Sequence, residues 1–207
     1  GIYSDTVKQN TVTRALVDSV FNFISSQNHT LDFSDCNICK SRAHIITRAI
    51  EKKFEGITTC KVWLFAAPKL SSKREYYRTK PEIWLQHKNI CSKWGYHVAP
   101  AIITSGDTFV IDPATQKSTV RLTDWASGLV PPGGEALLVI KHSLYYIFPD
   151  DKYDLFEDEK AVWYDEDENL FDEHYSRSVD EMVRTSLGFI EPWKMNERVW
   201  KIKKLIE

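Results

Sequence analysis

The chain has 207 residues, of which 43% are hydrophobic and 27% are charged, and its formal net charge is -2. A chain of this length can bury one sizeable core, so we expect a single domain over residues 1–207. The sequence has no apolar run near the ~20 residues that a membrane-spanning helix needs, and its start lacks the basic-then-apolar order of a signal peptide. The small net charge gives no general attraction for nucleic acid. We therefore expect neither a membrane nor a nucleic-acid partner.

The first 28 residues predict an amphipathic helix. Apolar side chains recur there close to the helical period, and Ser4 or Asp5 is placed to cap the helix start. We expect this helix to run from Asp5 to Asn28 and to pack one face on the core, with His29 in a surface loop.

A loop at residues 35–38 leads into a second helical pattern that reaches about residue 54. Apolar side chains form one face of this pattern, and Ser34 or Asp35 can cap its start. Cys39 therefore falls in or next to the first turn, where backbone N–H groups and the positive end of the helix dipole favour a thiolate. We expect Cys39 to be a nucleophile.

Residues 57–67, after a helix stop at Gly56, predict a strand that contains Cys60 as a buried, inert thiol. Residues 68–81 form a basic loop with interleaved tyrosines, interpreted as a solvated connection or as a contact for an acidic surface. A short strand is expected within residues 82–89.

Two apolar, β-branched runs flank the turn at residues 105–107 and predict an antiparallel hairpin. His97 opens the first run and Asp112 closes the second. Pairing about the turn brings both side chains to the same end of the hairpin. An imidazole oriented by a carboxylate is the base that a cysteine nucleophile requires.

The next segments predict further strands. Residues 120–126 fit a short helix or an edge segment, and residues 136–140 and 143–148 are two β-like runs on either side of His142. His142 is a second candidate for the base. It ranks below His97 because no carboxylate lies across a comparable hairpin from it.

An acidic stretch separates these runs from the C-terminal helices. The chain has 12 acidic and 2 basic residues between Asp150 and Glu173, which is typical of a solvated surface. Residues 178–187 and 193–206 predict two helices, the second begun by Pro192, and we expect them to cover the sheet.

The four cysteines leave other interpretations open. Cys36-x-x-Cys39 has the spacing of half a zinc site or of a redox pair, but no second close pair follows and a polar loop precedes the motif. One alternative is a non-enzymatic interaction module in which Cys36, Cys39 and Cys91 hold a metal. Four cysteines are too few for a disulfide scaffold at this length. If Cys39 stays free, at most one bridge can form among the other three.

Three ordered motifs resemble those of the bacterial protein-glutaminase (protein glutamine deamidase) family: Cys39-Lys40-Ser41-Arg42-Ala43-His44, Trp94-Gly95-Tyr96-His97-Val98-Ala99 and Val110-Ile111-Asp112-Pro113. The resemblance covers about residues 33–125. It implies an α+β, papain-like or transglutaminase-like fold, with the nucleophile at a helix N-terminus packed on an antiparallel sheet. The core would span about residues 33–150, and residues 151–207 would add an acidic and helical extension.

The resemblance also assigns residues. It implies a catalytic triad of Cys39, His97 and Asp112, and it places Trp94 and Tyr96 as flanking aromatic residues at the substrate. Arg42 and His44 match a helix motif to which we assign no catalytic role.

The activity implied is hydrolysis of the side-chain amide of protein-bound glutamine through a cysteine thioester, with release of ammonia and without a metal or cofactor. Transamidation and proteolysis by the same triad remain alternatives. The implied partners are a glutamine-bearing protein or peptide and an inhibitory propeptide or immunity protein. The charged composition favours a bacterial toxin or effector that is secreted or translocated into a target cell.

Overall fold

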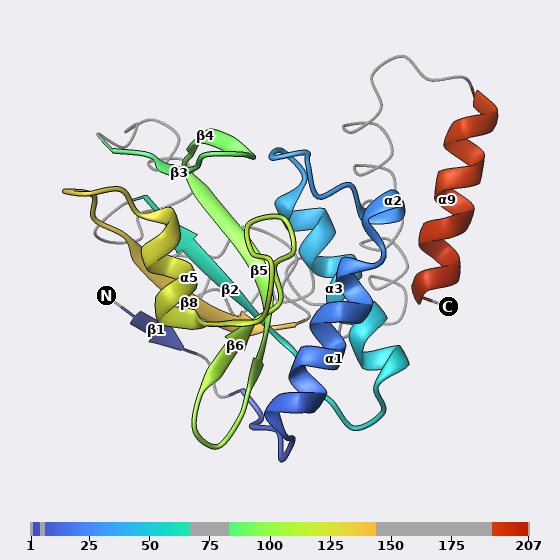
Figure 1. Cartoon of the computed structure of the whole chain (residues 1–207), viewed down its shortest axis with the longest axis horizontal. Coiled ribbons are helices and arrows are strands. Elements are labelled where there is room, and N and C mark those ends of the chain that lie inside the picture. Colours follow the sequence, from blue (N-terminus) through green and yellow to red (C-terminus); the bar gives the residue numbers. More distant parts are fainter. Residues whose placement is uncertain (1, 5–6, 67–82, 144–191, 207) are drawn as a thin grey trace, which may run out of the picture.

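The structure, a computed structural model, describes residues 2–4, 7–66, 83–143 and 192–206. These residues form an α+β fold with a six-stranded sheet in the order β1-β8-β2-β5-β6-β7 and a separate two-stranded sheet of β3 and β4. Helices α1, α2, α3 and α9 lie on one side of the large sheet, and α5 lies on the other (Figure 1). None of the described helices is long and apolar enough to cross a membrane.

The strands are β1 (Ile2–Ser4), β2 (Cys60–Phe65), β3 (Leu85–His87), β4 (Cys91–Trp94), β5 (Tyr96–Ile103), β6 (Thr108–Val110), β7 (Val120–Arg121) and β8 (Leu137–His142). The helices are α1 (Arg14–Ser25), α2 (Asn28–Leu31), α3 (Cys39–Lys53), α5 (Leu122–Leu129) and α9 (Pro192–Ile206).

Strand β2 is the centre of the large sheet. It is buried along its whole length and pairs antiparallel with both β5 and β8. The expected antiparallel arrangement is confirmed for the five strands from β8 to β7. At the other edge β1 pairs in parallel with β8. Without β1, the outer edge of β8 would present unpaired backbone groups. Strand β1 pairs with these groups as an added edge strand.

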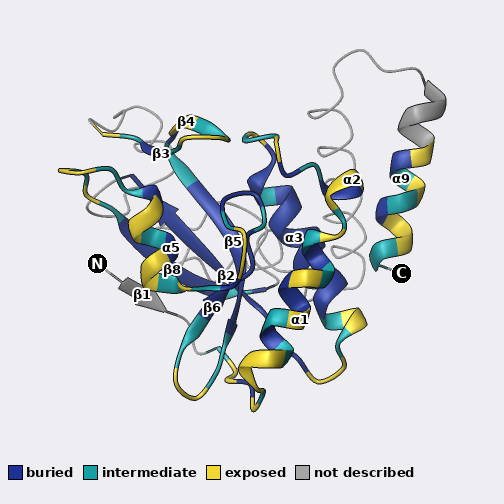
Figure 2. Ribbon diagram, viewed as in Figure 1, coloured by how far each residue is buried: buried dark blue, intermediate teal, exposed yellow. Residues whose placement is uncertain are grey.

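Successive side chains of β2 point to opposite faces of the sheet, as the period of a strand requires. Val62 and Leu64 pack with Trp125 of α5. Trp63 and Phe65 pack with the first turn of α3, next to Cys39. The inner faces of α1 and α3 are buried together with the sheet (Figure 2). The nucleophile candidate is thus fixed by the core on the α3 side.

The first helix is shorter than predicted. Helix α1 begins after Thr13, whose hydroxyl accepts a hydrogen bond from the backbone N–H of Leu16 at 3.3 Å. The expected cap at Ser4 is wrong, because Ser4 lies in β1. Asn10 explains the late start: its side-chain amide donates to the carbonyls of Thr58 (2.8 Å) and Ile103 (3.0 Å), which anchors this segment to the sheet.

The other predicted elements correspond to β2, β3, β8 and α9 with small shifts in their bounds. Residues 120–126, left open between a helix and an edge segment, contain both: β7 and the start of α5. The basic loop at 68–81, the run at 144–148, the acidic stretch and the helix expected at 178–187 lie outside the described residues.

Helix α9 packs on α2 and α3, so the expectation that it covers the sheet is wrong for this one of the two predicted terminal helices. Ile202 of α9 is fully buried in the same cluster as Ile50 of α3 and Leu31 of α2. Helices α1 and α3 already occupy this face of the sheet, so the apolar side of α9 is buried against the outer surface of that helical layer.

Candidate active site

Cys39 is the first residue of α3 and is almost completely buried. The cap predicted at Ser34 or Asp35 is wrong: Ile38 is the N-cap, and its side chain makes no capping hydrogen bond. The Asp35 carboxylate instead accepts the backbone N–H of Asn37 at 2.8 Å, which shapes the loop before the helix. The predicted position of Cys39 at the helix N-terminus is confirmed.

Arg42 fastens this loop to the helix. Its Nη1 donates to the carbonyl oxygens of Asp32 at 2.7 Å and of Asp35 at 2.9 Å, and the side chain is buried. A charged donor that bonds two carbonyls at once fixes their positions more firmly than neutral donors do. Arg42 therefore holds in place residues 35–38, the loop before Cys39 that we call the nucleophile loop. The sequence alone did not assign this role.

His97 and Asp112 lie at the same end of the β5–β6 hairpin, as predicted. The hairpin pairs Ala101 with Val110, and the backbone N–H of Ile111 extends the pairing to Pro100 at 2.9 Å. Asp112 follows directly, and its Oδ2 lies 2.9 Å from Nε2 of His97. Both residues are buried, so this pair is protected from water.

The Asp112 carboxylate accepts further hydrogen bonds at the same oxygen. Thr115 donates its hydroxyl at 2.5 Å, and Trp125 donates its indole N–H at 2.9 Å. Sequence reasoning missed both residues. Thr115 follows three residues after an Asp-Pro pair, a turn signal that could have identified it. Trp125 comes from α5, and no local pattern connects it to Asp112.

These contacts shift the pKa values of His97 and Asp112 in opposite directions. Burial alone would lower the pKa of His97, but the charge of Asp112 and the hydrogen bond to it outweigh burial and raise that pKa. Burial would raise the pKa of Asp112, but His97, Thr115 and Trp125 stabilise the carboxylate and hold its pKa below the ordinary 3.8. The pair therefore favours an imidazolium beside a carboxylate.

Cys39 lies close enough to His97 to contribute to the raised pKa of His97, although less than Asp112 does. Nε2 of His97 is engaged by Asp112, whereas the other ring nitrogen, Nδ1, is buried without a well-formed hydrogen bond in the described part of the chain. Nδ1 is thus the nitrogen available to exchange a proton with the thiol.

Two tryptophan rings enclose the imidazole. The ring of Trp94 stacks on that of His97 with 4.4 Å between centroids and 15° between planes, and the ring of Trp125 lies at 5.8 Å. Trp94 is buried, and its indole N–H donates to the carbonyl of Cys36 at 2.8 Å. This geometry makes Trp94 a positioning residue for the histidine and for the nucleophile loop.

Tyr96 is half-buried at the start of β5, with its ring 5.7 Å from that of Trp63 and 5.9 Å from that of Phe65. It packs on the cluster that also contains Cys39. A substrate-binding role for Tyr96 and Trp94 remains a prediction.

The other candidates lie elsewhere. His142 ends β8 and pairs with Cys60, whereas Cys39 packs on Leu137 at the opposite end of β8, so His142 is wrong as the base. His44 is buried on α3 with Nδ1 2.7 Å from Nζ of Lys61. Across the described residues, no group of three or more His, Cys, Asp or Glu side chains is arranged to hold a metal ion.

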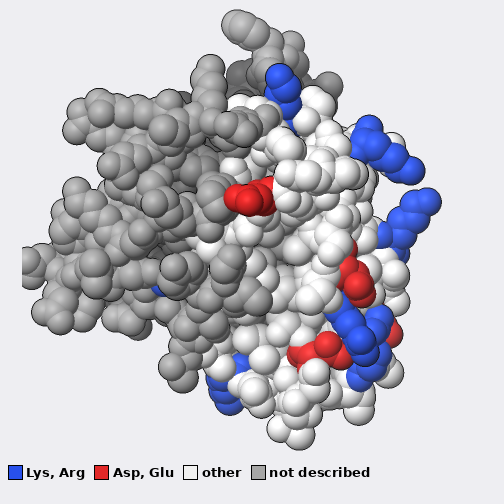
Figure 3. Space-filling view, turned by 90° about the vertical axis from the view of Figure 1, so that its left-hand side faces the viewer, with Lys and Arg blue, Asp and Glu red and all other residues white. Residues whose placement is uncertain are grey.

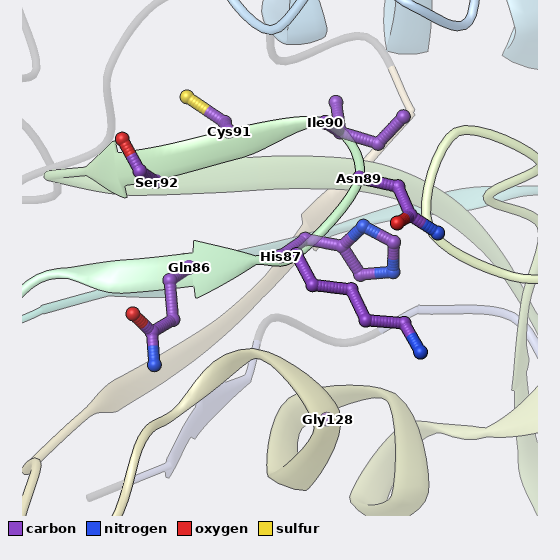
Figure 4. A pocket seen from close by; sticks show the side chains of 8 residues that line it. Gln86, His87, Asn89, Ile90, Cys91, Ser92 and Gly128 are labelled. Carbon is purple, nitrogen blue, oxygen red and sulfur yellow. The ribbon is translucent and has the colours of Figure 1, made fainter.

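A cavity of about 600 Å³ lies between the β3–β4 hairpin and Gly128 of α5 (Figure 4). Its lining includes the polar side chains of Gln86, His87, Asn89 and Ser92 together with apolar surface. On the side of the molecule shown in Figure 3, separate groups of Lys and Arg and of Asp and Glu lie among uncharged residues of the described surface. The cavity adjoins the elements that carry Trp94 and Trp125, but the triad candidates do not line it.

A cysteine at a helix N-terminus beside a buried histidine–aspartate pair is the arrangement used by enzymes that transfer acyl groups through a thioester. The family comparison agrees with this class. A family model described as glutaminase matches residues 12–129, more than half of the chain, and the chain therefore belongs to the protein-glutaminase family. No curated protein matches its sequence.

Solved structures share the fold. A crystal structure of pro-protein-glutaminase is similar with a TM-score of 0.55 at 18% identity, covering 87% of this chain and 62% of that one. A crystal structure of protein-glutaminase is similar with a TM-score of 0.51 at 17% identity, covering 92% of both chains. The chain thus spans about three fifths of the pro-protein and nearly the whole length of protein-glutaminase.

Proposed function

We propose that this protein hydrolyses the side-chain amide of glutamine in a protein or peptide, releasing ammonia and leaving glutamate. The observation that carries the proposal is the 2.9 Å contact between His97 Nε2 and Asp112 Oδ2, next to Cys39 at the start of α3. Membership of the glutaminase family supports amide hydrolysis as the reaction class.

In the first half of the proposed reaction, the proton of Cys39 resides on Nδ1 of His97, and the thiolate of this thiolate–imidazolium pair attacks the side-chain amide carbon of glutamine. The backbone N–H of Cys39 has no partner within the helix, because the first N–H groups of any α-helix lack one, and it can stabilise the tetrahedral oxyanion. The imidazolium then protonates the departing ammonia.

In the second half, His97 activates a water molecule that attacks the thioester and releases glutamate. Asp112 fixes the ring so that Nδ1 faces the sulfur, and it stabilises the imidazolium in both halves. Trp94 holds the ring from one side by stacking. A helix-borne cysteine packed on an antiparallel sheet that carries the histidine and the aspartate also supports a papain-like, transglutaminase-like core.

The test is ammonia release from glutamine-rich unfolded proteins, with mass spectrometry of the product. The protein should release ammonia and leave deamidation products at glutamine, whereas its Cys39→Ala variant should do neither. If an added amine is incorporated at glutamine in preference to water, the same triad acts as a transglutaminase, and backbone cleavage would identify a protease.

The proposal also covers how the enzyme is held inactive and where it acts. An inhibitory propeptide is suggested by the similar pro-protein-glutaminase structures, and secretion or delivery into a target cell as a toxin is part of the same proposal. Expression of the chain inside candidate target cells tests the toxin role: growth should fall with the unmodified chain and not with Cys39→Ala.

A further inference from the structure

Two cysteines that the proposed reaction does not use are neighbours on the same hydrophobic cluster. Cys36 belongs to the loop before α3, and Cys91 opens β4. Both are free, half-buried thiols that pack on the same hydrophobic cluster, and Cys91 lies close enough to Cys36 to act on the titration of that thiol. Burial, together with this contact, raises the pKa of Cys36.

The backbone on both sides of this contact is already fixed. The carbonyl of Cys36 accepts the indole N–H of Trp94, which ends the strand that Cys91 begins. Arg42 holds the carbonyl of Asp35, the residue before Cys36. Pairing of His87 with Cys91 fixes the hairpin side. A disulfide requires specific geometry, and these hydrogen bonds and strand pairing hold the backbones of the two neighbouring cysteines in place.

We propose that Cys36 and Cys91 form a disulfide under oxidising conditions, which joins the nucleophile loop to the β3–β4 hairpin and leaves Cys39 as a free thiol. The bond forms by exchange with a small disulfide such as oxidised glutathione. The two protein thiols lose two protons and two electrons, and the small disulfide is reduced to two thiols.

The packing selects Cys91 over Cys39 as the partner of Cys36. Cys39 packs with Ala43, Trp63 and Phe65 on the α3 side of the sheet, whereas Cys36 and Cys91 share the cluster on the α5 side. The fourth cysteine, Cys60, is fully buried in β2.

The bond would stabilise the site without consuming the nucleophile. It closes a long loop in the unfolded chain, which lowers the entropy of unfolding, and it reinforces the contact between Cys36 and Trp94. We expect the midpoint of thermal unfolding to rise by about 5 °C on oxidation. Retention of activity by the oxidised protein rests on the proposed function, whereas formation of the bond does not.

The experiment equilibrates the whole chain in a buffer with equal concentrations of reduced and oxidised glutathione, alkylates the remaining thiols and maps the disulfides by mass spectrometry. Trypsin leaves Cys36 and Cys39 in one peptide and Cys91 in another. The Cys39→Ala variant therefore separates the two possible partners, and it should form the same bond as the unmodified chain. Cys60 should be recovered as a thiol in both proteins.

Matched variants complete the test. Cys36→Ser and Cys91→Ser should each show neither the bond nor the rise in unfolding temperature. A Cys36–Cys39 bond, or four free thiols in this buffer, would overturn the proposal. If the Cys36–Cys91 bond forms but neither redox form releases ammonia, the disulfide stands and the proposed enzymatic function fails.

Discussion

Trp94 stacks on His97 and at the same time donates its indole N–H to the carbonyl of Cys36, so one side chain connects His97 to the loop that precedes Cys39. The two ring planes are nearly parallel, and both residues are buried. The relative position of Cys39 and His97 therefore depends on a residue that need not react itself.

Replacing Trp94 separates its two contacts. Trp94→Phe keeps a ring on His97 but leaves the Cys36 carbonyl without its donor, so we expect kcat to fall about 10-fold at a cost of about 1–2 kcal/mol in stability. Trp94→Ala also leaves a cavity and should destabilise the protein by about 3–5 kcal/mol. Activity assays and urea unfolding measure the two effects. Trp200, which is 59% exposed, provides the control, and Trp200→Ala should change little.

Asp112→Asn should preserve the size of the side chain but lose the charge that stabilises the imidazolium. We expect kcat to fall by about 10²- to 10⁴-fold. Thr115→Val removes only one of the donors to the same oxygen and should cost about 10-fold or less. Equal activity of Asp112→Asn and the unmodified protein would contradict the role of Asp112 as orienting residue.

The pH profile of activity should reflect the raised pKa of His97. The catalytic pair needs the imidazolium, which persists to a pH above the ordinary histidine value of 6.5 because Asp112 stabilises it. Activity should therefore extend into the alkaline range and fall as His97 loses its proton. In Asp112→Asn this alkaline limb should move to lower pH, and a limb that does not move would count against the pair.

Acid stability should depend on Asp112. Its pKa is lowered by folding, so its contribution to stability is complete above the ordinary 3.8 and is lost as the pH falls through the folded value. The contribution is on the order of 2 kcal/mol. Urea unfolding between about pH 6 and pH 3 should show the unmodified protein losing its advantage over Asp112→Asn as the pH falls.

Thiol alkylation should distinguish Cys39 from the inert thiol of Cys60. Burial raises the pKa of Cys60 to about 12, and its sulfur contacts the carbonyl of Ala101. As the proposed nucleophile beside His97, Cys39 should be modified by iodoacetamide at about pH 6 at least about 10-fold faster than Cys60. The rate at Cys39 should fall in His97→Ala, and similar slow rates at both cysteines would contradict a nucleophilic Cys39.

Arg42→Lys should loosen the nucleophile loop. Lysine cannot reproduce the planar donor group that reaches both loop carbonyls, so we expect a loss of about 2 kcal/mol in stability together with reduced kcat. The matched control is Arg121→Lys, because Arg121 is exposed and its pair with Asp107 lies at the surface. That control should stay within about 0.5 kcal/mol.

The sequence by itself determined the local elements and the candidates for chemistry. Apolar periodicity and turn residues predicted the helix that carries Cys39, the hairpin between His97 and Asp112, and the last helix, because these signals act between residues a few positions apart. The hairpin was the most informative of them. A tight turn fixes strand pairing, and pairing brings the two ends together.

Only the tertiary structure decided which residues surround the site. The indole of Trp94 reaches a carbonyl 58 positions away in the chain, and Trp125 reaches Asp112 from a separate helix. The late start of α1 depends on the hydrogen bonds of Asn10 to Thr58 and Ile103. Each of these contacts joins segments that approach one another only when the sheet has formed, and no local periodicity encodes them.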